Sequence, residues 1–194
     1  RFTKLDVADA SYHGINFVRD LPGSGFVTRI RAKLLRDTGA ALSPFNAWLL
    51  IQGLETLSLR IERHIENTRK ITAFLSKHPA VSKVNYPEVE GNKYQELAKK
   101  YLPKGCGSIF SIDLKDGYDA ACQFIDGLEI FSNLANVGDS KSLVIHPAST
   151  THQQLSEEAQ LAAGINPGTV RISVGLENAD DLLEDLENAL NNIG

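Results

Sequence analysis

Arg171 is the residue whose type and position point most directly to chemistry. It lies within the run from Thr169 to Val174, where apolar and polar residues alternate as in a strand. Successive side chains of a strand point to opposite faces, so Arg171 faces away from Val170 and Ile172. Its guanidinium presents a planar fork of N–H donors that matches a carboxylate through two hydrogen bonds. The run therefore predicts either a carboxylate-binding site or an ion pair with an acidic residue of the same domain.

A second candidate is the loop from Leu134 to Ser142, which joins two predicted strands and is dense in small polar side chains. Such a loop can offer backbone amides and the Asn136 side chain to a ligand. It can equally be a tight structural turn built on Gly138 and Asp139. The composition of the loop leaves both interpretations open.

Other motifs favour structural roles. His146 and His152 lie close together in the sequence, but no third ligand stands at metal-binding spacing, so no metal site is predicted. The segment 23–25 (GSG) lacks the lysine and the spacing of a phosphate-binding loop and predicts a plain turn. Cys106 and Cys122 form no C-x-x-C pair, which is typical of inert thiols in a reducing compartment.

The composition is that of an ordinary globular protein. The 194 residues are 42% apolar, with 24 acidic and 20 basic side chains, a net charge of −4 and two cysteines. These values argue against collagen-like, disulfide-scaffold and disordered proteins, and the lack of a basic excess argues against a nucleic-acid partner. No apolar run reaches the ~18 residues of a membrane span, and residues 1–10 do not resemble a signal peptide, so a cytoplasmic location is predicted. Because the sequence begins at Arg1 and has no methionine, we expect it to be part of a longer polypeptide.

A long helix is predicted from Ser43 and Pro44, a capping hydroxyl followed by proline at the first helical position. Apolar residues then recur every three or four positions as far as Leu75, and Pro79 closes the pattern. A single helix over residues 43–77 would be about 45–50 Å long at a rise of 1.5 Å per residue. That length exceeds what one small domain needs and predicts an element that bridges two domains.

Residues 78–194 alternate between predicted strands and helices. Strands are expected at 81–86, 108–114, 128–131, 143–146 and 169–174, and helices at 94–102, 118–125, 156–164 and 178–193, after a separate helix at 26–36. From residue 108 onward this order is typical of a ferredoxin-like split βαβ domain with one extra helix. The chain is therefore predicted to be an α/β protein with helices on one face of a mostly antiparallel sheet.

Three long runs resemble a known family. They are SPFNAWLLIQGLETLSLRIERH (43–64), LANVGDSKSLVIHPASTTH (134–152) and VRISVGLENADDLLEDLENAL (170–190). All three are similar to the Cys/Met-metabolism enzymes that depend on pyridoxal phosphate. SYHG (11–14) and LAKKYLPKG (97–105) are most similar to the O-acetylhomoserine sulfhydrylase branch of that family. The resemblance covers essentially the whole chain.

The resemblance implies the C-terminal part of an aspartate-aminotransferase-like fold. Residues 1–42 would be the tail of the large cofactor domain, 43–77 the bridging helix, and 78–194 the substrate-side domain. The family's cofactor-binding lysine lies in a Ser-x-x-Lys segment that this sequence lacks. No catalytic or cofactor-binding residue is therefore expected in this chain. Pyridoxal phosphate is expected in the full-length enzyme and not on this chain alone.

The resemblance also assigns substrate-binding roles. Arg171 would hold the α-carboxylate of an amino-acid substrate. Asn136 stands where many relatives have serine and would face the same carboxylate, while Ser142 and Thr151 would line the same region. Lys141 replaces an acidic residue of the lyase relatives, which favours a sulfhydrylase.

The implied reaction is the replacement of acetate on O-acetylhomoserine by sulfide or a thiol, giving homocysteine or methionine. Other members of the family (cystathionine γ-synthase, cystathionine γ-lyase and methionine γ-lyase) remain alternatives, as does a non-catalytic module for small-molecule binding or dimerisation. The resemblance further implies a homo-oligomer, a tetramer in this family, or association with the missing N-terminal part. No nucleic-acid or membrane partner is expected.

Overall fold

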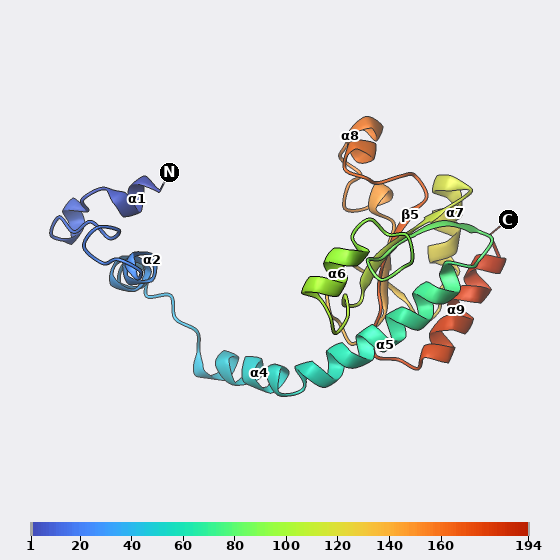
Figure 1. Ribbon diagram of the computed structural model, residues 1–194, viewed down its shortest axis with the longest axis horizontal. Helices are drawn as coiled ribbons and strands as arrows, with labels where there is room; N and C mark the ends of the chain where they lie inside the picture. Colours follow the sequence, from blue (N-terminus) through green and yellow to red (C-terminus); the bar gives the residue numbers. More distant parts are fainter. Residues whose placement is uncertain (1, 194) are drawn as a thin grey trace. The chain divides into compact units, whose positions relative to one another are not determined.

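The structure of the chain is a computed structural model that describes residues 2–193 (Figure 1). The chain divides into two compact units, Arg1–Leu54 and Glu55–Gly194. None of the helices in the described residues is long and apolar enough to cross a membrane. Arg171 and the other predicted substrate-binding residues lie in the second unit.

Up to Thr38, the first unit is built from short helical segments. They are α1 (Thr3–Asp6), a 3₁₀ turn (Ala10–Tyr12), α2 (Gly25–Arg29), a wider π-type stretch (Ile30–Leu35) and α3 (Arg36–Thr38). The last three follow one another without a break, so the helix predicted at 26–36 is confirmed and is slightly longer at both ends.

Thr56 interrupts the predicted long helix. The structure has two helices, α4 (Pro44–Glu55) and α5 (Leu57–Leu75), in place of a single one over 43–77. Thr56 adopts φ −105° and ψ 7°, outside the helical region. A β-branched residue is a weak helix former, and Gly53, shortly before it, is weaker still. The single-helix prediction was therefore wrong at this point.

Capping residues begin three of the helices, as their sequence positions predict. Ser43, Ser156 and Asn178 accept a hydrogen bond from a backbone amide two or three residues further on, at 3.1, 3.3 and 2.8 Å respectively. The last two residues precede α8 (Glu157–Ala162) and α9 (Ala179–Asn191). Side-chain acceptors at these positions satisfy amides that a helix start leaves without an intrahelical partner.

The second unit contains a five-stranded sheet in the order β1-β2-β5-β4-β3. The strands are β1 (Val81–Asn85), β2 (Ile109–Leu114), β3 (Ser132–Asn133), β4 (Leu143–Ile145) and β5 (Thr169–Ser173). Neighbouring strands are antiparallel except β3 and β4, which are parallel. The mostly antiparallel sheet is confirmed. The ferredoxin-like arrangement is corrected, because there β3 and β4 would form an antiparallel hairpin.

Strand β3 begins after the predicted segment 128–131 has ended, because Asp185 of α9 binds the amides of that segment. The backbone N–H groups of Glu129, Ile130 and Phe131 donate to the Asp185 carboxylate at 2.9, 3.0 and 3.4 Å. Asp185 is only 7% exposed. Amides that donate to a side chain are not available for a strand ladder, so the expected strand is replaced by a turn.

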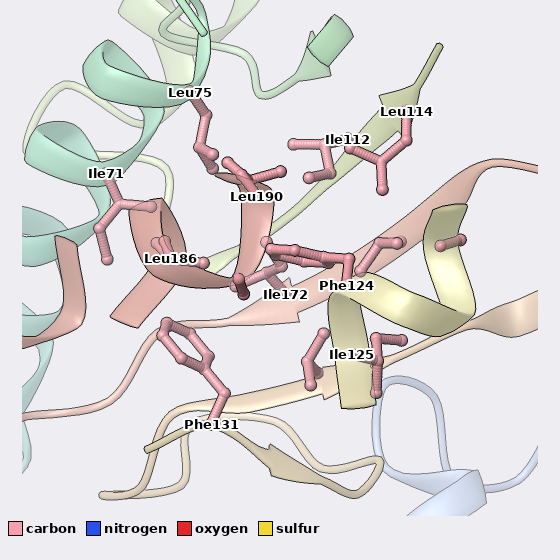
Figure 2. Packing of buried hydrophobic residues seen from close by; sticks show 14 of the residues in the cluster. Ile71, Leu75, Ile112, Leu114, Phe124, Ile125, Phe131, Ile172, Leu186 and Leu190 are labelled. Carbon is pink, nitrogen blue, oxygen red and sulfur yellow. The ribbon is translucent and has the colours of Figure 1, made fainter. Parts of the chain in front are cut away.

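One face of the sheet is covered by three helices, α5, α7 (Gly117–Asp126) and α9 (Figure 1). Ile71 of α5, Phe124 of α7 and Leu186 of α9 meet Ile172 of β5 in this layer, and all four are fully buried (Figure 2). The predicted helical layer on one face is thus formed by α5, α7 and α9. The remaining helix before β2, α6 (Gln95–Tyr101), follows the loop after β1.

Strand β5 directs its side chains as its alternation predicts. Val170 and Ile172 are fully buried in the core, whereas Arg171 between them is partly exposed. Arg171 therefore projects from the face of the sheet that α5, α7 and α9 leave uncovered.

Candidate functional site

A hollow of about 580 Å³ lies on the sheet face that carries Arg171. We call it the Arg171 hollow. Its lining comes from the sheet, from the segment after β1 and from the segment after β4, and consists of Asn85, Pro87, Asn92, Tyr94, Ile109, Phe110, Ser111, Ile145, Pro147, Thr151, His152, Ala163, Gly164, Ile165, Thr169 and Arg171. This size suits a small organic molecule.

Arg171 is the fixed positive charge of this hollow. It stands opposite Ser111 of β2 and Ile145 of β4 in the sheet register. Aspartate, glutamate and lysine are absent from the described lining residues. No carboxylate of residues 2–193 pairs with Arg171, so the predicted alternative of an ion pair is not found within the described chain.

Within residues 2–193, the side chain of Arg171 makes one hydrogen bond. Its Nη2 donates to the backbone oxygen of Asn136 at 3.2 Å. The other guanidinium donors find no acceptor among the described residues, and Arg171 is partly exposed to the hollow. A guanidinium with free donors in a hollow without acidic groups can bind a carboxylate through two hydrogen bonds.

Asn136 belongs to the loop of residues 134–142, which we call the Asn136 loop. Its amide Nδ2 donates to Asp139 Oδ2 at 3.0 Å, and the Lys141 amide donates to Asp139 Oδ1 at 3.0 Å. The hydrogen bond from the Lys141 amide, and to a smaller extent the one from Asn136, holds the pKa of Asp139 below its ordinary value. Gly138 has a positive φ of 69°. The loop is therefore the tight turn that Gly138 and Asp139 predicted, and it also brings a carbonyl to Arg171.

Ser142 closes the Asn136 loop and does not line the hollow. It is fully buried, and its hydroxyl donates to Glu177 Oε2 at 2.9 Å and accepts from the Gly175 amide at 2.8 Å. Its own amide donates to Glu177 Oε1 at 2.7 Å. Thr151 does line the hollow, where its hydroxyl lies 2.8 Å from His152 Nδ1. The structure thus brings Arg171, the Asn136 carbonyl and Thr151 to one region but turns Ser142 away from it.

The buried histidine His146 is bound by protein groups at both ring nitrogens. Its Nε2 donates to the Pro167 carbonyl at 2.7 Å, while Nδ1 lies 2.9 Å from Ser149 Oγ and 3.7 Å from Cys122 Sγ. Residues 2–193 contain no group of three or more His, Cys, Asp or Glu side chains that could hold a metal ion. Burial raises the thiol pKa of Cys122 and of Cys106, so both favour the protonated form.

The polar lining residues that were not predicted as ligand groups include Ser111, Tyr94 and His152. Ser111 had a usable signal, because it lies on the polar side of an alternating strand. No sequence pattern marked Tyr94, because it follows β1 in a loop and only the tertiary fold brings it to the hollow. His152 was considered only as a metal ligand.

The hollow does not by itself fit pyridoxal phosphate. The sequence resemblance implies a cofactor bound through a lysine, and lysine is absent from the described lining. The free donors of Arg171 fit the carboxylate of an amino acid instead. No step through the cofactor is assigned to the residues of this chain.

Comparisons with known proteins point to one family. A family model described as "Cys/Met metabolism PLP-dependent enzyme" matches residues 18–191. An O-acetyl-L-homoserine sulfhydrylase of Leptospira meyeri is 52% identical over 100% of this chain and 46% of its own length. An O-acetyl-L-homoserine sulfhydrylase 1 of Thermus thermophilus is 45% identical over 98% of this chain and 45% of its own.

A solved structure shows the same fold. The crystal structure of a putative O-acetylhomoserine (thiol)-lyase of Campylobacter jejuni, which contains N'-pyridoxyl-lysine-5'-monophosphate, has a TM-score of 0.88 and 47% identity. The match covers 98% of this chain and 45% of the chain in that crystal structure. The chain thus spans less than half the length of these relatives.

Proposed function

Given that the chain belongs to the Cys/Met-metabolism family of pyridoxal-phosphate-dependent enzymes, we propose that it is the substrate-side part of an O-acetylhomoserine sulfhydrylase. In the complete enzyme, sulfide would displace acetate from Cγ of O-acetylhomoserine to give homocysteine and acetate, and a thiol such as methanethiol would give methionine. The bound cofactor supplies the electron sink that such chemistry at an amino acid needs. The cofactor lysine would come from the part of the enzyme outside this chain.

The observation that carries this proposal is the Arg171 guanidinium, which has no carboxylate partner among residues 2–193 and borders a hollow whose described lining holds no acidic residue. A substrate α-carboxylate would bind there, next to the Asn136 loop, with Thr151 on the wall. This contact would fix the orientation of the amino acid before the reaction. Holding a reactant in the reactive geometry increases the rate, because less freedom is lost in reaching the transition state.

The domain assignment follows from the same proposal. Residues 1–42 would be the tail of the large cofactor domain and residues 78–194 the substrate-side domain. The helical region 43–77 would join them, and the division of the chain after Leu54 supports this placement. The complete enzyme would be a homo-oligomer, as the resemblance implies, and would act in the cytoplasm.

The relatives favour a sulfhydrylase over the other members of the family. The relatives from Leptospira meyeri and Thermus thermophilus are both named as sulfhydrylases, and a fission-yeast relative at 43% identity is named homocysteine synthase. The exposed Lys141 on the Asn136 loop is consistent with this group.

The test is an assay of the longer protein that carries this chain, loaded with pyridoxal phosphate. We expect homocysteine and acetate from O-acetylhomoserine and sulfide. Cystathionine formed only with cysteine as sulfur donor would indicate a synthase. Release of ammonia and a keto acid without a sulfur donor would indicate a lyase, and either result would replace the proposal.

A further inference from the structure

We infer that Glu177 is a positioning residue, which holds the Asn136 loop in place over Arg171 and so shapes the carboxylate site. The inference rests on the proposed function, because it concerns the binding of the same substrate carboxylate. Glu177 lies in the turn between β5 and α9 and has no place in the lining of the hollow. It acts through the loop and does not itself contact the substrate.

The carboxylate of Glu177 binds both donors of Ser142. Oε1 accepts the Ser142 amide at 2.7 Å, and Oε2 accepts the Ser142 hydroxyl at 2.9 Å. Ser142 is fully buried, so these bonds are shielded from water and either donor would be costly to leave unpaired. The C-terminal end of the Asn136 loop is thereby fixed to the turn after β5.

The backbone of this turn also approaches the loop closely. The Leu176 amide donates to the Ser140 carbonyl at 2.9 Å, and the Gly175 amide donates to the Ser142 hydroxyl at 2.8 Å. A Cβ added at Gly175 would lie 2.5 Å from the Ser140 oxygen and 2.3 Å from Glu177 Oε2. Only glycine leaves room for this contact, so the loop and the turn fit together in one arrangement.

Helix α5 fixes the turn from the opposite side. Asn67 Nδ2 donates to the carbonyls of Gly175 and Glu177 at 3.1 and 2.9 Å, and His64 Nδ1 donates to the Val174 carbonyl at 2.6 Å. Both side chains are at least 98% buried. Because the backbone of Glu177 is held, its carboxylate has a defined direction and can transmit that direction to the loop.

The N-terminal part of the Asn136 loop contacts Arg171, the residue proposed to bind the substrate carboxylate. The Asn136 carbonyl accepts the Arg171 Nη2 hydrogen bond at 3.2 Å. A loop released at Ser142 would no longer hold that carbonyl at a fixed place, and Arg171 would lose its partner and its preferred orientation. Misplacement of a binding group by about 1 Å can reduce rate by two orders of magnitude.

A carboxylate is required at position 177 because both Ser142 groups that face it are donors. Glutamine offers one acceptor oxygen, and its NH₂ group is a donor that would face the Ser142 hydroxyl, so the hydroxyl proton that Glu177 Oε2 now accepts would lose its acceptor. Glu177→Gln therefore breaks one of the two bonds with almost no change in volume. Glu187→Gln is the matched control. Glu187 is exposed on α9, and its substitution changes the charge by the same amount.

The experiment measures steady-state kinetics and thermal unfolding of the longer holoenzyme with these two substitutions. We expect Glu177→Gln to raise KM for O-acetylhomoserine about tenfold or more, with KM for sulfide within about twofold of wild type. We expect Glu187→Gln to leave both values unchanged. A KM for O-acetylhomoserine that stays within about twofold in Glu177→Gln would overturn the inference.

Two further variants keep the test decisive. If Glu177→Gln lowers the melting temperature strongly, Ser142→Ala removes the hydroxyl contact alone and is expected to raise the same KM. In an Arg171→Ala background, Glu177→Gln should have no further effect on KM, whereas additive effects would contradict a role through Arg171. If Arg171→Ala leaves KM for O-acetylhomoserine unchanged, the proposed function is rejected. If Arg171→Ala raises this KM and Glu177→Gln does not, only the present inference is rejected.

Discussion

Arg171 and Asn136 lie 35 positions apart in the sequence, yet a 3.2 Å hydrogen bond joins the Arg171 guanidinium to the Asn136 backbone oxygen. The bond uses one guanidinium donor, and Arg171 borders a hollow whose described lining holds no acidic residue. The contact therefore positions the guanidinium and leaves its other N–H donors available to a substrate carboxylate. We therefore regard this pair as the centre of the candidate carboxylate site.

Arg171→Ala should raise KM for O-acetylhomoserine strongly in the longer holoenzyme, because removing one partner of a charged pair that substrate binding would bury costs about 2–5 kcal/mol of binding. The visible absorbance of the cofactor should not change, since Arg171 lies on the substrate side. Arg63→Ala on α5, which removes an arginine that is 55% exposed, is the control. Unchanged substrate kinetics in Arg171→Ala would remove this residue from the site.

Asp185→Ala should lower the free energy of unfolding by about 3 kcal/mol, because several buried amides lose their acceptor at once. Those amides belong to Glu129, Ile130 and Phe131. Glu184→Ala, at an exposed position of the same helix, should change stability by less than about 0.5 kcal/mol. Urea unfolding of the three proteins measures both values, and equal midpoints would show that the Asp185 contacts contribute nothing.

Two glycine substitutions should have opposite effects on stability. Gly175→Ala should be destabilising, because its Cβ would lie 2.3 Å from Glu177 Oε2 and 2.5 Å from the Ser140 oxygen. Gly53→Ala should stabilise α4 by up to about 1 kcal/mol, because a Cβ there meets nothing within 4 Å and alanine favours helix. Thermal melting of both variants is the measurement. Stabilisation by Gly175→Ala would contradict the close contact between loop and turn.

Glu88 should make stability depend on pH in acid. Burial by itself raises the pKa of Glu88, but hydrogen bonds from Arg69 Nε at 2.6 Å and from the Cys106 amide at 2.8 Å outweigh it, so the pKa lies below its ordinary value of 4.5. A pKa lowered by folding contributes stability that is fully present above the unfolded value and is lost as the pH falls through the folded value.

Glu88→Gln should therefore be less stable than wild type at neutral pH by about 1 kcal/mol, since the ion pair with Arg69 is partly exposed. The difference should shrink as the pH is lowered below 4.5. Unfolding free energies of the two proteins from neutral to acid pH provide the comparison. A constant difference across this range would show that ionisation of Glu88 is not linked to folding.

Features that depend on local periodicity and capping were predictable from the amino-acid sequence alone. Alternation in the run from Thr169 to Val174 placed Arg171 on the face opposite Val170 and Ile172, because a strand has a two-residue period whatever it packs against. Ser156 and Asn178 marked helix starts correctly, since a cap involves only neighbouring residues. The family resemblance identified the fold, which the TM-score of 0.88 confirms.

Contacts between groups that are distant in the sequence were set by the folded arrangement of the chain. Asp185 displaced the expected strand at 128–131 by binding its amides from α9. Glu177 turned Ser142 away from the hollow, and Asn136 met Arg171 through its backbone oxygen, with its side chain bound to its own loop. These outcomes depend on hydrogen bonds between residues far apart in the chain, whose geometry no local pattern contains.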